Sequence, residues 1–226
     1  MELTPRLQAI ADQVPQGVRF ADVGTDHGYL PVWLLRNGKI SAAIASDLRE
    51  GPLNRARQTA LQFGQTERIS FRLCGGLAGI APDEAEVIAI AGMGGETIAA
   101  ILADAPWTHS DKLLLLQPMT GLPELRQWLQ EHHYAIQQEQ IVREGKRLYT
   151  VWTVKDGTMP PFTPAELWAG RQSRDPLRSD YLTWIIEKAE KALAGHQAAH
   201  TPDPSAISRL TLVLDGLKQM KEELEG

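Results

Sequence analysis

Cysteine is nearly absent from this chain, and so are the segments that a membrane or a secretory route would require. The single cysteine, Cys74, excludes an internal disulfide and a zinc site built on paired cysteines. No apolar run approaches the roughly 18–20 residues that span a bilayer, and the start, MELTPRLQAI, lacks the basic residues and the apolar block of a signal peptide. We therefore expect a cytoplasmic protein that has no membrane partner.

An excess of positive charge is missing as well. The formal net charge is −5 over 226 residues, whereas a generic nucleic-acid-binding domain is expected to be basic. The segment 159–226 holds eight Lys/Arg and ten Asp/Glu, so it is not basic either. We expect no DNA partner, and binding of RNA would have to rest on a local patch of charge.

What is present is a regular alternation of strand and helix patterns over residues 1–158. The expected strands are VRFADV, AAIAS, RISFRL, EVIAIA and KLLLLQP, with a final antiparallel pair over residues 135–154 that turns at Glu144–Lys146. The second, fourth and fifth are almost entirely apolar, as in parallel strands covered by helices on both faces. The pattern predicts a Rossmann-like, doubly wound α/β domain with a mostly parallel sheet and an antiparallel last strand. Its ligand should lie beyond the carboxyl ends of the strands.

Residues 159–226 have a different character and are predicted to form a second, helical domain. The segment KDGTMPPFTP is rich in turn residues, and two apolar stripes with helical spacing follow it, separated by AAHTPDPS. The first stripe contains Leu182, Ile185, Ile186, Ala189 and Leu193, and the second contains Ile207, Leu210, Leu214, Leu217 and Leu224. Two amphipathic helices with a short polar break predict an antiparallel, coiled-coil-like hairpin.

The glycine-rich stretch FADVGTDHGYLP joins the first strand to the next helix and indicates the ligand. A turn that binds a dinucleotide needs a glycine where this chain has Asp26, and a carboxylate there would repel pyrophosphate. S-adenosylmethionine carries a cationic sulfonium and an ammonium group instead, so carboxylates favour it. Asp47, 23 residues after Gly24, stands where an acid accepts hydrogen bonds from ribose hydroxyls. The alternatives are structural roles, with Asp22 and Asp26 as acids that stabilise the turn and Asp47 as a helix cap.

Two further features of the loops are ambiguous. His27 either packs locally in the turn or contacts the methionine part of the cofactor; a metal role is disfavoured because no second ligand stands at a sensible spacing. The loop AIAGMGGET follows the fourth strand, and its glycines expose backbone that can approach a flat base edge. The alternative is a plain glycine-rich turn, and a phosphate loop is disfavoured because no Lys-Ser/Thr pair follows.

Taken together, these loops resemble those of the bacterial tRNA adenine-N1 methyltransferases that act on adenine 22. The matching segments are RLQAIADQVPQGVRFADVGTDHGYLP, EGPLNRA, IAGMGGETI, LLLQP and REGKRLY, which occur in the expected order from about residue 3 to residue 154. The element IAGMGG is the most specific, because other base methyltransferases carry an Asn/Asp-Pro-Pro-Tyr loop there. The resemblance implies a Rossmann-like domain followed by a helical coiled-coil domain, which fits the two amphipathic stripes.

The chain departs from the family pattern at two places on the ligand edge. Cys74-Gly75-Gly76 stands where relatives commonly have a polar residue between two glycines, and Met119 stands where relatives often have Asn. The contact with the cofactor's adenine must then come from backbone or from another residue. Both departures touch the ligand edge, so cofactor affinity and the choice of acceptor are the properties in which this chain can differ from relatives.

The resemblance implies methyl transfer from S-adenosylmethionine to N1 of an adenine in tRNA. Asp26, Gly92, Met93 and Gly94 are the expected catalytic residues. The expected cofactor-binding residues are Asp22, Gly24, Thr25, Asp26, His27, Gly28, Asp47, Leu48, Gly75, Gly76, Ala91 and Gly92. The expected RNA-binding residues are Arg6, Lys146, Arg147, Arg171 and Arg174, the last two recurring with Arg178 at helical steps. A solvated surface is the alternative for these cations.

Two other functions stay open on the sequence. One is a methyltransferase with a different acceptor, and the other is a catalytically idle protein that binds cofactor or RNA. We expect a monomer or a weak dimer.

Overall fold

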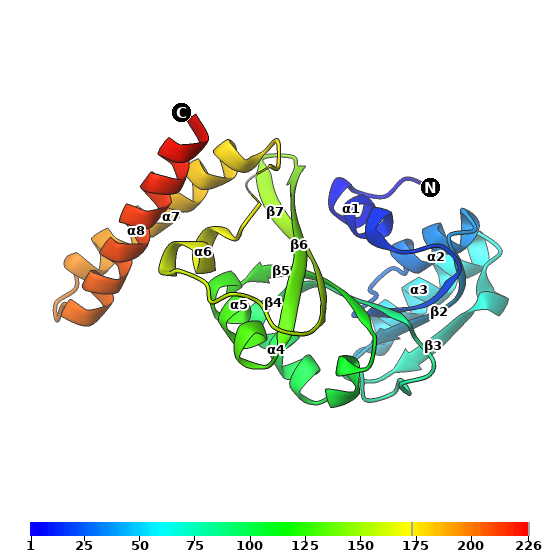
Figure 1. Ribbon diagram of the computed structural model, residues 1–226. Helices are drawn as coiled ribbons and strands as arrows, with labels where there is room; N and C mark the ends of the chain where they lie inside the picture. The colour runs from blue at the N-terminus through cyan, green and yellow to red at the C-terminus, as the bar shows by residue number, and fades with distance from the viewer. Residues whose placement is uncertain (173, 226) are drawn as a thin grey trace.

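The computed structural model describes residues 1–172 and 174–225, which form a seven-stranded sheet with helices on both faces and a helical hairpin at one end (Figure 1). The strands are β1 (Val18–Val23), β2 (Ile40–Asp47), β3 (Ile69–Leu73), β4 (Val87–Gly94), β5 (Leu113–Thr120), β6 (Tyr134–Glu144) and β7 (Arg147–Asp156). Their order is β3-β2-β1-β4-β5-β7-β6. The first five pair in parallel, whereas β7 is antiparallel to both β5 and β6. The predicted mostly parallel sheet with an antiparallel last strand is therefore confirmed.

The helices follow the expected alternation, with one addition. They are α1 (Pro5–Gln13), α2 (Tyr29–Arg36), α3 (Glu50–Gln62), α4 (Gly95–Ala103), α5 (Leu122–Glu131), α6 (Pro164–Ala169), α7 (Arg178–Gln197) and α8 (Pro204–Glu225), with 3₁₀ turns η1 (Thr66–Arg68) and η2 (Pro106–His109). Helix α6 was not expected, because six residues are too few to show a helical period. It begins at a capping box in which Thr163 and Glu166 bond each other's backbone N–H groups.

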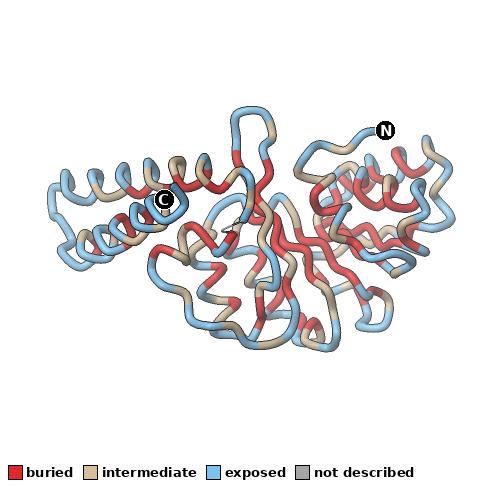
Figure 2. Tube along the Cα trace, turned by 45° about the horizontal axis from the view of Figure 1, so that its top comes forward, coloured by how far each residue is buried: buried red, intermediate tan, exposed pale blue. Residues whose placement is uncertain are grey.

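The sheet has an apolar core on each face, and alternate residues of one strand serve the two cores. Val87 and Ala89 of β4 pack with α1, α2 and α3, while Ile88 and Ile90 pack with α4 and α5. This two-residue period, with both sets buried, explains why the sequence of β4 is apolar throughout. Figure 2 shows the same result as buried chain along the central strands and exposed chain at the periphery.

The β6–β7 hairpin connects the sheet to the C-terminal helices. Strand β5 pairs only with Trp152–Val154 of β7, so the end of the hairpin near its turn extends beyond β5. On this extension Val142 packs on the α1 side, whereas its neighbour Ile141 packs with α6, α7 and α8. The hairpin thereby places α7 beside the carboxyl edge of the sheet, where the ligand is expected.

A buried ion pair fixes the helical end to the sheet. The Arg126 side chain of α5 is fully buried, and its Nε donates to Glu139 of β6 at 2.7 Å. Its Nη1 also donates to the carbonyl of Leu167 at 2.7 Å, near the end of α6. One guanidinium is thus shared by a helix, a strand and a helix end where the two predicted domains meet, in addition to the apolar contacts of Ile141.

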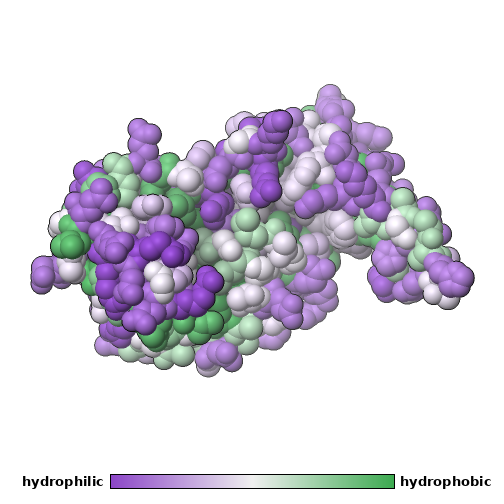
Figure 3. Space-filling view, turned by 180° about the vertical axis from the view of Figure 1, so that it is seen from behind, coloured by the Kyte–Doolittle hydropathy of each residue, from purple (hydrophilic) through white to green (hydrophobic). Residues whose placement is uncertain are grey.

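Helices α7 and α8 pair as the predicted hairpin, with small shifts in the apolar stripe. Leu182, Ile185 and Ala189 of α7 are buried as expected, whereas on α8 Val213 is buried and Leu224 is exposed. Hydrophilic residues cover much of the face shown in Figure 3, and less polar residues gather toward its middle. None of the described helices is long and apolar enough to cross a membrane.

Candidate functional site

The turn after β1 depends on three residues with positive φ. Gly24, Asp26 and Gly28 have φ of 72°, 49° and 67°. A Cβ on Gly24 would lie 2.2 Å from Cε of Met93, and a Cβ on Gly28 would lie 2.9 Å from Cβ of Ala56. Conformation favours glycine at both places. At Gly28 the close approach of Ala56 adds to this preference, whereas the flexible end of Met93 could move away from a Cβ at Gly24. Asp26 adopts a left-handed conformation that aspartate tolerates better than most residues.

Three carboxylates surround this turn, each in a different setting. Asp22 is 6% exposed and accepts a hydrogen bond from Thr25 Oγ1 at 2.6 Å. Burial raises the pKa of Asp22 to about 6, with the Thr25 hydrogen bond acting in the opposite direction and the nearby Asp47 charge adding to the rise. Asp22 thus carries a negative charge at neutral pH that burial makes costly and that a cationic ligand would stabilise.

Asp47 holds the turn in place from the end of β2. Its Oδ1 accepts from the N–H of Arg49 at 2.9 Å, and its Oδ2 accepts from the N–H of Asp26 at 3.4 Å. Helix α3 follows with Arg49 at its N-cap, so Asp47 is not itself the N-cap residue. Each oxygen keeps a second lone pair, so the carboxylate can still accept from a ligand hydroxyl.

Asp26 and His27 occupy the open side of the turn. Asp26 forms an ion pair with Arg55 of α3 at 2.6 Å, a residue that the sequence did not suggest. The His27 ring stacks on Tyr29 with 5.2 Å between centroids, and both residues line the same cavity. His27 therefore packs locally and also lines the cavity, and its contact with the methionine part of the cofactor stays a prediction.

A cavity of about 360 Å³ lies beyond the carboxyl ends of β1 and β4. Seven of the predicted cofactor residues line it: Asp22, Gly24, Thr25, Asp26, His27, Ala91 and Gly92. Thr4, Arg6 and Leu7 of the first helix segment close it from above, together with Tyr29 and Leu30. Asp47 touches the turn from outside this cavity through its bond to Asp26.

Leu48, Gly75 and Gly76 lie farther along the same edge of the sheet. Leu48 is 74% exposed, and its Cδ1 lies 3.5 Å from the place that a Cβ of Gly75 would occupy. Gly76 has φ of 53° and approaches Ile101 of α4. An exposed leucine beside a bare glycine, next to a carboxylate, suits the flat apolar face and the hydroxyls of a nucleoside.

The glycine segment after β4 differs from the expected loop. Gly92, Met93 and Gly94 continue β4, in which Met93 pairs with Pro118 and Gly94 with Thr120 of β5 across two register shifts, and α4 begins directly at Gly95. A strand was not expected here because glycine is depleted in strands. The Gly95 Cα lies so close to Gly121 that a Cβ there would approach its carbonyl oxygen within 2.3 Å. The Met93 side chain lies over Gly24 and packs against the core on the α4 side, and of these three residues Gly92 lines the cavity.

Gln117 holds this backbone in position and was not singled out in the sequence. Its side chain is fully buried, and its Oε1 accepts from Gly92 N–H at 3.0 Å and from Arg6 Nη1 at 2.6 Å. A lone amide at the end of the apolar run LLLLQ was the available signal, because a buried polar group needs partners. Arg6, expected to bind RNA, thus lies at the wall of the cofactor cavity.

The other predicted RNA-binding residues fall into two groups. Lys146 and Arg147 are exposed at the β6–β7 turn, close to the site because Glu144 accepts from the N–H of Arg6 at 3.1 Å. Arg171 instead donates to Glu166 and to the carbonyls of Pro160 and Pro161.

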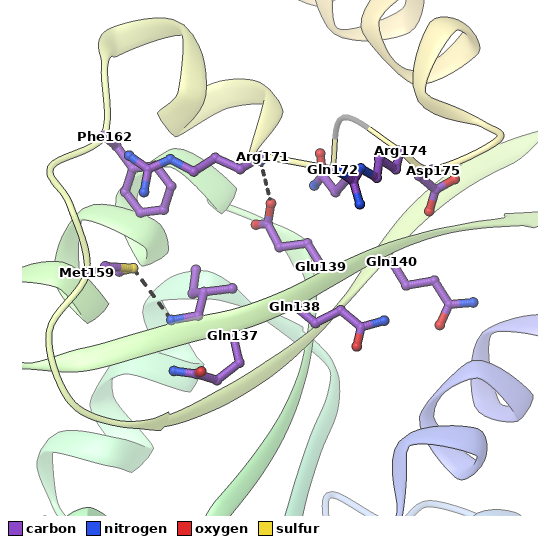
Figure 4. A pocket seen from close by; sticks show the side chains of 11 residues that line it. Gln137, Gln138, Glu139, Gln140, Met159, Phe162, Arg171, Gln172, Arg174 and Asp175 are labelled. Atoms are coloured by element: carbon purple, nitrogen blue, oxygen red, sulfur yellow. Dashed lines mark hydrogen bonds between the residues drawn. The ribbon is translucent and has the colours of Figure 1, made fainter.

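Arg171, Arg174 and Arg178 do not share a helical face, since α7 begins only at Arg178. Pro176 lies in this segment, and the helical conformation is disfavoured for the residue before a proline, here Asp175. Arg178 is buried, with its guanidinium on the carbonyls of Ala169 and Gly170. Figure 4 shows Arg171 and Arg174 around a separate cavity of about 410 Å³ on the outer edge of β6.

The donor set around the turn fits S-adenosylmethionine. The carboxylates suit a ligand with positive charge, and Asp26 stands where a pyrophosphate would need a glycine and bare N–H groups. Leu48, Gly75 and Asp47 suit its nucleoside. Asp22 and Asp26 would hold the charged methionine end, Asp47 the ribose, and Leu48 the adenine.

Comparison with known proteins agrees with this chemistry. A family model described as a methyltransferase domain matches residues 3–152. A tRNA (adenine(22)-N(1))-methyltransferase of Bacillus subtilis is 38% identical over 162 residues, which make up 70% of this chain and 66% of that protein.

Solved structures extend the similarity beyond that segment. The structure of the B. subtilis m1A22 tRNA methyltransferase TrmK superimposes with a TM-score of 0.83 at 30% identity, covering 99% of both chains. A Streptococcus pneumoniae protein crystallised with S-adenosyl-L-methionine superimposes with a TM-score of 0.85 at 32% identity, covering 97% of this chain and 100% of that one.

Proposed function

This chain belongs to the family of S-adenosylmethionine-dependent tRNA (adenine-N1)-methyltransferases, and from that premise we propose that it methylates N1 of adenine 22 in tRNA. The observation that supports this most is the meeting of two features at one cavity. A turn lined by carboxylates and the backbone of Gly92, held by Gln117, lie together at the carboxyl edge of the sheet. The first suits a cationic methyl donor, and the second leaves uncovered backbone for the edge of a base.

The chain's task in this reaction is positioning. S-adenosylmethionine, when bound, supplies an electrophilic methyl group on a positively charged sulfur. N1 of neutral adenine already carries a lone pair, so no residue has to remove a proton from it first. Alignment of reacting groups contributes up to about 7–11 kcal/mol, whereas a general base contributes about 10²–10⁴-fold. Alignment is therefore the larger effect that this site has to supply.

Electrostatics add to the alignment. Methylation at N1 leaves the adenine with a positive charge near neutral pH. Asp26 is the most exposed of the three carboxylates at the turn, and Arg55 balances only part of the local negative charge. Asp26 would stabilise the cofactor's ammonium or the methylated base. The base must also leave its stack in the folded tRNA, at a cost of a few kcal/mol, and the exposed Gly92, which lines the cavity, would receive its edge.

Transfer of labelled methyl groups tests the proposal directly. The wild-type protein is incubated with labelled S-adenosylmethionine and unmodified total tRNA, and the product nucleoside is identified and mapped. Label in 1-methyladenosine at position 22 is expected. Label in another nucleoside, or no label in tRNA although the cofactor binds, would contradict the proposal.

The role of Asp26 is tested by Asp26→Ala and Asp26→Asn in the same assay. A lost charge-assisted hydrogen bond costs about 1.5–3 kcal/mol, so turnover should fall about 10- to 100-fold. The matched control is Asp83→Ala, which removes an exposed acid far from the turn. Near wild-type turnover in both folded Asp26 variants would remove the assignment.

The proposal also includes a cytoplasmic location, because the tRNA acceptor is found there. It requires neither DNA nor a membrane as a partner.

A further inference from the structure

A second cavity, of about 540 Å³, lies between the sheet and the helical hairpin. Its lining comes from the carboxyl end of β5, the start of β7 and one face of α7, and includes Met119, Arg147, Tyr149, Trp184 and Lys188. We call it the α7 groove. None of these five residues except Arg147 was expected to bind anything, although Met119 was noted as a departure from the family pattern.

The α7 groove lies next to the proposed reaction site. Gly94, at the end of β4, pairs with Thr120, which lines the groove. Arg6 lines the cavity beside the β1 turn, and its guanidinium carbon lies 5.7 Å from the ring centroid of Tyr149, which lines the groove. The ends of β4 and β5 and the side chain of Arg6 therefore lie between the two cavities. A strand in the groove would pass close to the end of β4.

The charges of the groove favour an anionic ligand. Arg147 and Lys188 are both exposed, and neither forms an ion pair with a residue that the structure describes. Glu124 is the one acid among the lining residues. Nearby arginines are in contrast already neutralised, Arg143 by Asp180 and Arg171 by Glu166. The two cations of the groove are thus available to a phosphate.

The aromatic residues of the groove favour a base. Lys188 Nζ lies 3.8 Å from the centroid of the Trp184 ring, so the cation and the aromatic surface form one unit. Partial burial lowers the pKa of Lys188, and a phosphate would offset that loss of hydration. Aromatic side chains that stack on unpaired bases, combined with cations that follow the backbone, are the usual means of binding single-stranded nucleic acid.

We propose that the α7 groove binds the nucleotide next to the methylated adenine in the tRNA chain, with its base against Trp184 and Tyr149 and its phosphate between Arg147 and Lys188. This inference rests on the proposed function, because it places the strand that carries the acceptor. It gives the helical hairpin a specific role: α7 supplies one wall of the acceptor site.

Two pairs of variants test the groove in the full-length protein. Lys188→Ala is compared with Lys191→Ala, which removes an exposed lysine of the same helix that does not line the groove. Trp184→Leu, which keeps an apolar side chain, is compared with Trp184→Phe, which keeps an aromatic ring. Binding of unmodified, transcribed tRNA is measured over a range of salt concentrations, and binding of S-adenosylmethionine is measured by calorimetry.

The groove predicts a separate signature for each contact. Lys188→Ala should weaken tRNA binding and reduce the slope of log affinity against log salt concentration by about 0.7–0.9, the value for one phosphate, while Lys191→Ala leaves the slope unchanged. Trp184→Leu should weaken binding about 5- to 150-fold at every salt concentration, and Trp184→Phe should remain near wild type. Affinity for S-adenosylmethionine should be unchanged in all four.

The outcomes separate this inference from the proposed function. If wild-type protein methylates tRNA but Lys188→Ala and Trp184→Leu bind tRNA like wild type, the groove inference is wrong and the function stands. If wild-type protein binds the cofactor but neither binds nor methylates tRNA, both are wrong. Equal losses in Trp184→Leu and Trp184→Phe would also overturn the stacking role, because an aromatic ring would not then be what the site requires.

Discussion

The two sides of the carboxyl edge of the sheet carry charges of opposite sign. On the β1–β2 side, Asp22, Asp26 and Asp47 surround the turn. Arg55 pairs with Asp26, and Nε2 of His27 lies 3.7 Å from the same carboxylate. On the β5–β7 side, Arg147 and Lys188 form no ion pair within the described chain, and Glu124 is the single acid of the α7 groove. A cationic methyl donor and an anionic acceptor strand thus each meet the complementary sign. A net charge of −5 hides this, since bulk charge averages over both sides.

The two sides also differ in how the chain builds them. The carboxylate side comes from a short stretch between residues 22 and 47, within one strand–helix–strand unit. The cationic side combines the end of β5, the start of β7 and a helix that begins at Arg178. Local structure therefore suffices for the first side, whereas the second exists only if the helical hairpin docks correctly.

Loss of the docking contact is expected to give the largest effect. Arg126→Ala removes one partner of a fully buried ion pair, which costs about 3–5 kcal/mol of unfolding free energy. Urea denaturation measures this, with Arg19→Ala as control, because that arginine's pair with Glu86 is exposed to solvent and should contribute little to stability.

In Arg126→Ala protein that remains folded, tRNA affinity should fall further than affinity for S-adenosylmethionine, since the cationic side depends on α7. Equal losses of the two affinities would show that the two sides do not depend differently on docking.

Removal of the carboxylate at the end of β2 should have an intermediate effect on the other side. Asp47→Ala deletes an acceptor for the ribose and releases the N–H groups of Arg49 and Asp26. Affinity for S-adenosylmethionine should fall about 10- to 100-fold, from about 1.5–3 kcal/mol for a charge-assisted bond, while tRNA binding is unchanged. Calorimetry with Asp83→Ala as control measures the first, and an unchanged cofactor affinity would contradict the assignment.

Lowering the pH should weaken cofactor binding less than the Asp47→Ala substitution does. The pKa of Asp22 is raised to about 6 by burial in the free protein, and a cationic ligand favours the ionised form, so the complex has a lower pKa than the free protein. Affinity for S-adenosylmethionine should therefore be constant above about pH 6 and fall by at most about tenfold per pH unit below it.

The stability of the free protein should depend on pH in the opposite direction, rising as Asp22 becomes protonated. An acid with a raised pKa costs stability when ionised, so this cost disappears as the pH falls through about 6 toward the pKa of the unfolded chain.

Asp22→Asn should bind the cofactor weakly, and its affinity should not change between pH 5 and 7. A wild-type profile in that variant would assign the titration to another group.

Much of the fold could be predicted because its signals are local. The two-residue period of β4 and the apolar run of β5 report buried parallel strands directly, and Pro52 in the first turn of α3 marks a helix start. Helix α6 lacked such a signal, and glycine content concealed the continuation of β4 to Gly94.

The candidate site divides in the same way. Asp22, Asp26 and Asp47 are separated by short spacings that imply a shared edge, so the cofactor side could be inferred. The bond from Arg6 to Gln117 joins residues 111 positions apart, and no pattern links them. Arg171 was a plausible phosphate ligand by spacing, yet its donors are used by Glu166 and the carbonyls of Pro160 and Pro161.

The amino-acid sequence alone thus determined most of the strands and helices, and which sign of charge follows β1 and β2, because periodicity and turn chemistry act over a few residues. Only the tertiary structure decided which cations remain available and that α7 forms a wall beside Gly94. Those outcomes depend on which side chains from distant segments come into contact in the folded protein. Packing decides these contacts, and no local preference does.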